Sequence, residues 1–110
     1  MGNSEKESIA NKVALDIFVH AEAQLEVQET FYYYQDLNDG LGFEFMRSLD
    51  ATLQFIKRNP SSYQKIYKEV RRVLIRKFPY AVFYIVEETR IVIIACQHQK
   101  RSEIDWIRRS

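Results

Sequence analysis

The chain has 110 residues and a net charge of +1, and 46% of the residues are hydrophobic, which suits one compact core and excludes two ordinary domains. No stretch reaches the roughly 20 apolar residues of a membrane-spanning helix, and the polar start MGNSEKESIANK lacks the apolar core of a signal peptide. The sequence therefore predicts a cytoplasmic protein without membrane attachment, with a flexible extension over residues 1–12 and a single domain over residues 13–110.

The N-terminal half is predicted to form one strand and two helices. Residues 13–19 are β-branched and aromatic enough for a strand, and residues 21–37 lack Gly and Pro and have a helical composition. The turn NDGLG at 38–42 precedes a second helix, which ends before Pro60 because proline disfavours a helical conformation of the residue before it. The second helix has an apolar stripe at helical spacing, made by Leu41, Phe45, Leu49, Leu53 and Ile56.

Three β-rich runs follow, at residues 70–76, 80–87 and 90–97. A tight turn near Glu88 joins the last two, and strands this close in sequence pair as an antiparallel meander. The run that begins at Tyr80 is apolar on both faces, so it belongs in the middle of the sheet. The order predicts an α+β fold with an N-terminal strand, an α-helical hairpin and an antiparallel three-strand meander, the helices packed on one face of the sheet.

The two halves of the chain differ in charge. Residues 1–56 hold 3 Lys or Arg against 10 Asp or Glu, whereas residues 57–110 hold 13 against 5. Such a basic half suits an anionic partner, either nucleic acid or an acidic protein segment, although charges along a strand edge also prevent aggregation. Between residues 57 and 77, Glu69 is the only carboxylate beside eight cations, which are Lys57, Arg58, Lys65, Lys68, Arg71, Arg72, Arg76 and Lys77.

Few residues are available for catalysis. Cys96 and His98 alternate in one predicted strand without a third group to orient them, and His20 lies far away in sequence. No phosphate-binding glycine motif is present. We therefore predict no metal site and no cofactor, and we expect Cys96 to be a small buried apolar residue. What remains near the ends of the C-terminal strands is a group of cations, one imidazole and two aromatic rings that could serve RNA cleavage or protein binding: Arg71, Arg72, Lys77, Tyr80, His98, Lys100, Arg101 and Trp106.

Four segments form an ordered series: EAQLEVQETFYYY, GLGFEFMRSLDATLQFIKRNP, VRRVLIRKFPYAVFYIV and IACQHQKRSEIDWIRR. Over roughly residues 13–109 the series resembles the ParE branch of the RelE/ParE superfamily, the toxins of bacterial type II toxin–antitoxin modules. The resemblance implies the same α+β fold. Its most specific parts are Arg71-Arg72, the triplet Phe78-Pro79-Tyr80 with Tyr84 after it, and His98-x-x-Arg101 with Trp106 downstream.

The resemblance implies a toxin that a cognate antitoxin neutralises through a C-terminal tail rich in acidic and apolar residues. A basic sheet edge beside exposed aromatic rings would suit such a tail. We expect the target to be DNA gyrase, as the ParE-like branch implies. The alternatives are a ribosome-dependent mRNA endonuclease of the same fold, which would act on the ribosome and mRNA, and a degenerate, non-toxic binding module. The fold does not decide between these functions.

For the endonuclease alternative, the resemblance implies a cleavage site that needs no metal. His98 would protonate the leaving 5′-oxygen, and Arg71 or Arg72 would hold the phosphate. Arg101 would offset the developing charge, and Glu69 is a conceivable base. Structural interpretations stay open for three of these residues, since Glu69 could pair with a neighbouring lysine, His98 could cap a strand end and Arg101 could pair with a nearby carboxylate.

Other residues are predicted to contact the partner or the target. Trp106, in the tail IDWIRR, either docks the tail against the sheet or contacts the target. The four rings at 31–34 cannot all face the core because successive helical residues step by about 100°, so one or two must lie at its rim. The predicted partner-binding and target-binding residues are Arg72, Lys77, Tyr80, Trp106, Arg108 and Arg109.

Overall fold

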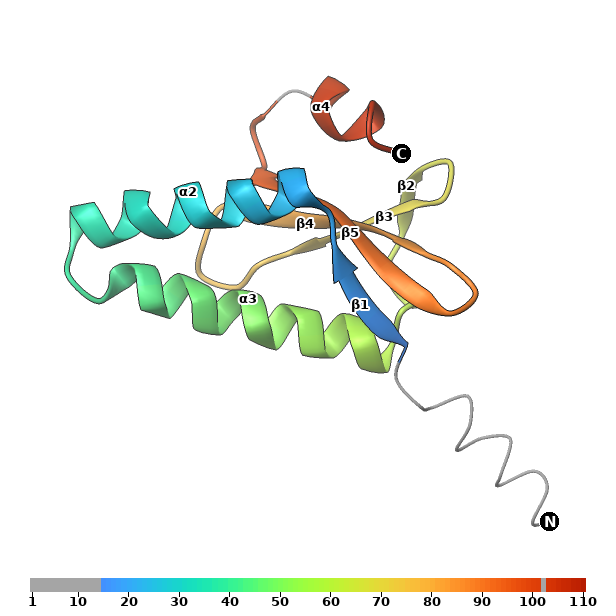
Figure 1. Cartoon of the computed structure of the whole chain (residues 1–110), viewed down its shortest axis with the longest axis horizontal. Helices are drawn as coiled ribbons and strands as arrows, with labels where there is room; N and C mark the ends of the chain where they lie inside the picture. The colour runs from blue at the N-terminus through green and yellow to red at the C-terminus, as the bar shows by residue number, and fades with distance from the viewer. Residues whose placement is uncertain (1–14, 102) are drawn as a thin grey trace, which may run out of the picture.

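The computed structural model describes residues 15–101 and 103–110, so the expected extension over residues 1–12 lies outside the described residues. The predicted α+β class is confirmed (Figure 1). In chain order the elements are β1 (Asp16–Val19), α2 (Ala21–Leu37), α3 (Leu41–Arg58), β2 (Lys65–Tyr67), β3 (Val70–Leu74), β4 (Tyr80–Val86), β5 (Arg90–His98) and the short α4 (Ile104–Ile107).

Helices α2 and α3 form the predicted hairpin, and its turn depends on two glycines and one glutamine. Gly40 has φ 93°, a left-handed conformation that glycine adopts without strain. A Cβ on Gly42 would lie 2.6 Å from the Phe31 carbonyl oxygen, so only glycine allows the helices to approach this closely. The side-chain oxygen of Gln35 accepts hydrogen bonds from the backbone N–H groups of Gly40 (3.2 Å) and Gly42 (3.0 Å). These bonds satisfy donors that the start of α3 would otherwise leave unpaired.

The sheet has five strands in the order β1-β5-β4-β3-β2, which places β4 in the middle, as its two apolar faces predicted. The expected N-terminal strand and the expected meander of β3, β4 and β5 are confirmed, and β2 is an additional strand that was not predicted. Strand β1 pairs in parallel with β5 at one edge, and β2 pairs antiparallel with β3 at the other. Strand β2 has only three residues, too few for an alternating pattern to distinguish it from a loop.

Each face of the sheet is covered by a different element. The apolar stripe of α3, with Phe45, Leu49 and Ile56, packs on one face together with α2. On the opposite face, Trp106 of α4 packs against Phe83 and its apolar neighbours. Figure 1 shows α2 and α3 side by side and α4 set apart from them. The sequence predicted helices on one face only, because the four-residue helix α4 has no recognisable period. None of the helices in the described ranges has the length and apolarity to cross a membrane.

Candidate functional site

A groove lies between helix α3 and strand β3, and residues of the turn from β3 to β4 also line it. Its volume is about 710 Å³. Arg47 comes from α3, Arg72 from β3, and Arg76 and Lys77 from the turn, and all four side chains are exposed. We call this feature the basic groove. Its lining is completed by apolar and aromatic side chains, among them Ala51, Phe55, Tyr63, Val73, Leu74 and Phe78.

Among the described residues, the four cations of the basic groove have no carboxylate partner. Within the described part of the chain, none of them forms an ion pair, and Glu44 is the only carboxylate among the lining residues. By contrast, Lys65 pairs with Glu69 at 3.0 Å, and Arg90 pairs with Glu87 at 2.8 Å. Unpaired cations gathered over an apolar surface produce a positive potential that favours an anionic ligand.

The turn from β3 to β4, which carries Arg76 and Lys77, has an unusual backbone conformation. Lys77 has φ 72°, a conformation that a residue with a side chain adopts only at a cost. The turn is closed by the backbone N–H of Ile75, which donates to the Tyr80 carbonyl at 2.9 Å. Such local strain is more frequent at functional sites than elsewhere.

Arg71, unlike its neighbour Arg72, has a structural role. Its guanidinium donates to the carbonyl oxygens of Ser61 (3.1 Å) and Tyr63 (2.6 Å), which fixes the loop after α3. The Tyr84 hydroxyl donates to the Pro60 carbonyl at 2.7 Å and holds the same loop. Burial raises the pKa of Tyr84 to about 12, against a smaller lowering by Arg71, so the phenol stays protonated as a donor. This loop supplies Tyr63 to the basic groove.

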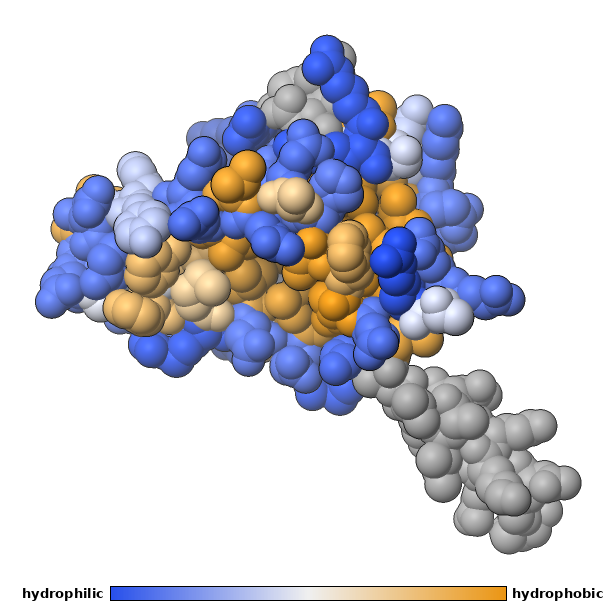
Figure 2. Space-filling model, viewed as in Figure 1, coloured by the Kyte–Doolittle hydropathy of each residue, from blue (hydrophilic) through white to orange (hydrophobic). Residues whose placement is uncertain are grey.

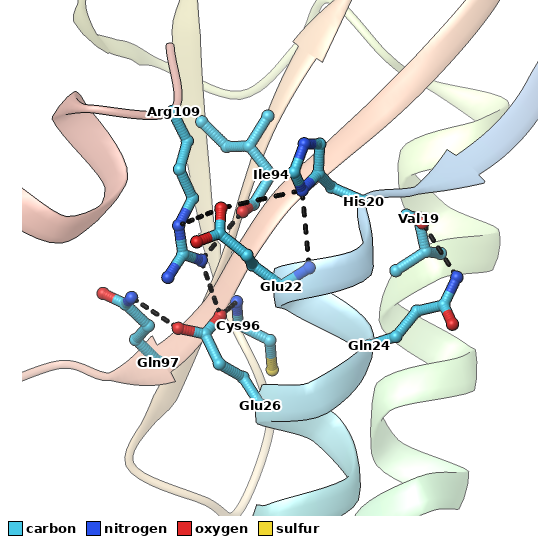
Figure 3. A network of polar contacts seen from close by, with 9 residues as sticks. All are labelled: Val19, His20, Glu22, Gln24, Glu26, Ile94, Cys96, Gln97 and Arg109. Carbon is cyan, nitrogen blue, oxygen red and sulfur yellow. Dashed lines mark hydrogen bonds and ion pairs between the residues drawn. The ribbon is translucent and has the colours of Figure 1, made fainter.

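A second polar cluster, beside strand β5, ties the C-terminal segment to α2 (Figure 3). The carboxylate of Glu26, only 9% exposed, accepts from the guanidinium of Arg109 (3.0 Å), the backbone N–H of Cys96 (3.0 Å) and the side-chain amide of Gln97 (2.7 Å). Arg109 also donates to the Ile94 carbonyl at 3.0 Å and contacts Glu22 at 3.3 Å. We call these residues the Glu26 cluster. Both carboxylate oxygens of Glu26 thus accept hydrogen bonds from groups within the fold.

Cys96 is buried, as the sequence analysis expected. Burial raises the pKa of its thiol to about 12, and the neighbouring Glu26 carboxylate adds to the effect. The thiol is therefore protonated and a poor nucleophile at neutral pH. Among the described residues, no group of three or more His, Cys, Asp or Glu could hold a metal ion.

The tail residues differ in their availability. Trp106 is 4% exposed and stacks on Phe83 with ring centroids 5.0 Å apart, so it docks the tail against the sheet. Arg109 belongs to the Glu26 cluster, whereas Arg108 is exposed beside it. Of the residues predicted to contact a partner, Arg72 and Lys77 are exposed in the basic groove. Tyr80 instead packs in an aromatic cluster with Tyr34, Phe45 and His98.

Two residues predicted for RNA cleavage, Arg71 and His98, lie far apart. On β4, the position opposite Arg71 and the position opposite His98 lie four residues apart, which is about 13 Å along a strand. Glu69 is paired with Lys65. His98 accepts a hydrogen bond from the backbone N–H of Lys100 at 3.1 Å at the end of β5, and its carbonyl accepts one from the backbone N–H of Arg101 at 2.9 Å.

Sequence reasoning missed three residues that build these sites. Arg47 and Phe55 line the basic groove from α3, but they lie outside the basic run at residues 57–77. Glu26 was not singled out either. Its position at helical spacing between the buried residues Ala23 and Thr30 is a usable signal, because a carboxylate on a buried face needs a partner.

Solved structures share this fold, and two of them show the extent of the similarity. One belongs to a chromosomal ParDE toxin–antitoxin system from P. aeruginosa, with a TM-score of 0.69 and 10% identity, covering 77% of this chain and 96% of that one. The other is a mutant of the E. coli toxin RelE in the free state, with a TM-score of 0.66 and 15% identity, covering 88% of this chain and 98% of that one. The chain thus has the fold of the RelE/ParE toxin superfamily.

Sequence comparison narrows the class further. The model of the family described as the ParE toxin of the type II toxin–antitoxin system, parDE, matches residues 17–103. The chain belongs to this family, as the ordered series of segments predicted, and membership implies an antitoxin partner. No curated protein matches the chain.

Proposed function

We propose that the chain is a growth-inhibiting toxin held inactive in the cytoplasm by a cognate antitoxin, whose acidic and apolar tail occupies the basic groove. The observation that supports this proposal is a set of cations without an ion-pair partner among the described residues, which are Arg47, Arg72, Arg76 and Lys77, beside exposed apolar side chains. A phosphate backbone would use the cations alone, whereas an acidic peptide with apolar side chains would use both parts of the lining.

The edge of β3 favours an extended segment in the tail. Strand β2 is aligned with β3 only at Val70 and Arg71, and the N–H of Arg72 bonds the Gln64 carbonyl just before β2. Beyond this point, no described strand pairs with the outer edge of β3, which runs beside the groove as far as the exposed Leu74. An extended peptide could add its backbone hydrogen bonds to this edge.

For the target we propose DNA gyrase, in line with the ParE-like resemblance. The separation of Arg71 from His98 and the structural hydrogen bonds of Arg71 weigh against a nuclease site assembled from these residues. No observation favours the endonuclease or the inactive module over this proposal, and the experiments below distinguish all three.

The target is tested by inducing the toxin in a bacterial host and mapping mRNA 5′ ends genome-wide, with a gyrase supercoiling assay on the purified chain. We expect growth arrest and inhibited supercoiling, without new 5′ ends phased with codons. Codon-phased ends that disappear in His98→Ala would establish the endonuclease instead. Absence of any arrest would leave a binding module that has lost its toxicity.

Charge reversal in the groove tests the antitoxin contact. The partner is sought as the product of a small neighbouring gene that encodes a DNA-binding head and an acidic tail. The double variant Arg72→Glu/Arg76→Glu should remain folded and toxic, but co-expression of that product should no longer restore growth. Lys57→Glu is the control, because Lys57 belongs to the same basic run of the sequence but does not line the basic groove. This variant should be rescued like the parent. Equal rescue of both variants would contradict the proposed site.

A further inference from the structure

Strand β1 forms an open edge of the sheet, because among the described strands it pairs only with β5. The backbone N–H of His20 donates to the Ile93 carbonyl on β5, and alternate residues of a strand direct these groups to the same neighbour. Ile17 and Val19 therefore direct theirs away from the sheet. In agreement, the Val19 carbonyl accepts from the side chain of Gln24 at 3.0 Å. The N–H and C=O of Ile17 have no partner among the described residues.

A hollow of about 710 Å³ lies beside this edge, between β1 and the C-terminal half of α3. We call the hollow and the outer side of β1 together the β1 edge. Figure 2 shows apolar side chains at the surface over β1, bordered by hydrophilic ones. The charged residues that line the hollow are two acids and two bases, Asp16, Asp50, Lys57 and Arg90. Unlike the basic groove, the β1 edge thus has balanced charge and offers little attraction to an acidic tail or to nucleic acid.

An exposed aromatic ring stands on the other face of β1. Ile17 and Val19 pack in the core on the helix side, so strand alternation places Asp16 and Phe18 on the opposite face. Phe18 is 46% exposed, and the guanidinium carbon of Arg90 lies 4.7 Å from the centre of its ring. Open strand edges are either protected by charges or covered by another chain. A large ring in the middle of a four-residue edge strand favours a covered edge.

The geometry points to a second copy of this chain at the β1 edge, with the two β1 strands paired antiparallel about a two-fold axis at Ile17. Since Ile17 directs its N–H and C=O outward, it exchanges two hydrogen bonds with the partner's Ile17. Asp16 then lies opposite the partner's Phe18, on the same face of the joined sheet. The partner's Arg90, which covers that ring, meets the Asp16 carboxylate, and the symmetry repeats this contact.

The charges on α3 obey the same symmetry. Asp50 and Lys57 lie seven residues apart on the side of α3 that lines the hollow, with Leu53 and Gln54 between them, and neither forms an ion pair within the described part of the chain. A two-fold axis sets the two α3 helices antiparallel, so each acid faces the partner's base. The basic groove is at the opposite side of the strand order, so the dimer leaves it open to the antitoxin in both copies.

Cysteine cross-linking of the full chain tests the register. Opposite positions without backbone hydrogen bonds have Cα atoms about 4.5 Å apart, a separation that a disulfide spans. Asp16→Cys mixed with Phe18→Cys should therefore give a disulfide-linked dimer on mild oxidation. Either variant alone should give about tenfold less, because identical positions are diagonal neighbours about 7 to 8 Å apart. The native Cys96 is buried and does not compete.

A second mixture controls for random collisions. Phe43 is exposed on α3, away from the β1 edge, so Asp16→Cys mixed with Phe43→Cys should also give about tenfold less linked dimer. Non-reducing gels and mass spectrometry measure the products. Equal yields from the two mixtures, or an equal yield from Phe18→Cys alone, would overturn the proposal.

Sedimentation equilibrium of the parent chain tests the dimer without cysteines. The average mass should rise with concentration towards twice the mass of the chain. Asp16→Arg sets a cation against the partner's Arg90 and should lower the association constant about tenfold. Asp36→Arg makes the same change at an exposed position of α2 outside the β1 edge and should leave the constant unchanged. A parent chain that stays monomeric, or equal effects of the two substitutions, would overturn the proposal.

Discussion

Arg109 and Arg72 both belong to the basic half of the chain, and both were predicted to bind a partner, yet their surroundings are opposite. The Arg109 side chain is 13% exposed and is held by the Glu26 carboxylate and the Ile94 carbonyl. Arg72 is exposed and has no carboxylate partner in the described ranges. The comparison teaches that local charge density does not identify a binding cation. A cation is available to a ligand only where the fold has not already supplied its counter-ion.

The largest expected effect is at the Glu26 cluster. Arg109→Ala leaves the nearly buried Glu26 carboxylate without its cation, which should lower the free energy of unfolding by about 3 kcal/mol. Because Trp106 is the only tryptophan and lies under the tail, its emission should also shift to longer wavelength if the tail detaches. Urea denaturation followed by Trp106 fluorescence measures both.

Two arginines serve as controls for that experiment. Arg108→Ala changes the exposed neighbour in the tail, and Arg72→Ala changes an exposed cation of the basic groove. Each should alter the unfolding free energy by less than about 0.5 kcal/mol. If Arg72→Ala destabilised the chain as much as Arg109→Ala, the distinction between a structural and an available arginine would be lost.

The buried residues should also affect the stability of the chain at alkaline pH. The folded pKa of Cys96 is raised to about 12, above the ordinary value of about 8.5 for an unfolded thiol. The thiol therefore contributes stability that is complete below about pH 8.5 and is lost as the pH rises towards 12, because only the unfolded chain releases the proton readily. Between pH 8.5 and 10 the loss should reach about 1.5 kcal/mol.

Cys96→Ala isolates this contribution. The variant starts from a lower stability because a buried side chain is truncated, but its stability should fall less steeply over the same pH interval. Chemical denaturation at pH 7.5, 8.5, 9.2 and 10 compares the two slopes. Parallel slopes would mean that the thiol is not the titrating group.

The fold was largely predictable because its main elements have local signals. The apolar stripe of α3 and the two apolar faces of β4 indicated a helix packed on a central strand, and both are confirmed. Strand β2 and helix α4 have three and four residues, so neither completes a period. Strand β1 pairs in parallel with β5, which comes from the other half of the chain, and no local pattern identifies a partner so distant in sequence.

The candidate site was predictable in composition but not in detail. The basic run indicated an anionic partner, yet which cations remain unpaired depends on contacts between distant residues. Arg109 follows Glu26 by 83 positions in the sequence, so their pairing could not be read from spacing. Arg71 and Arg72 are adjacent and chemically identical, but strand alternation gives one to the Ser61 and Tyr63 carbonyls and the other to the groove.

A smaller effect is expected at the loop that supplies Tyr63 to the basic groove. Tyr84→Phe removes the hydroxyl that donates to the Pro60 carbonyl, which should lower the unfolding free energy by about 1 kcal/mol. Hydrogen exchange at the Ser62 amide, which bonds the Asn59 carbonyl within this loop, should become faster. Tyr33→Phe, on an exposed ring, should change neither quantity. Unchanged exchange in Tyr84→Phe would show that Arg71 alone holds the loop.

The smallest expected effect has the opposite sign and belongs to the groove. Lys77 has a left-handed backbone, and Lys77→Gly removes a strain of about 1 to 2 kcal/mol while adding flexibility worth about 0.5 to 1 kcal/mol to the unfolded chain. The variant should therefore be more stable by about 0.5 kcal/mol, although it loses one groove cation and should bind an acidic tail more weakly. Arg76→Gly removes the neighbouring cation from a backbone without positive φ, so it should weaken binding and lower stability together. Denaturation midpoints and the affinity for an acidic Leu/Glu peptide, measured on both variants, test these expectations. A stability loss in Lys77→Gly as large as that in Arg76→Gly would mean that the turn is not strained and that its geometry does not serve the presentation of charge.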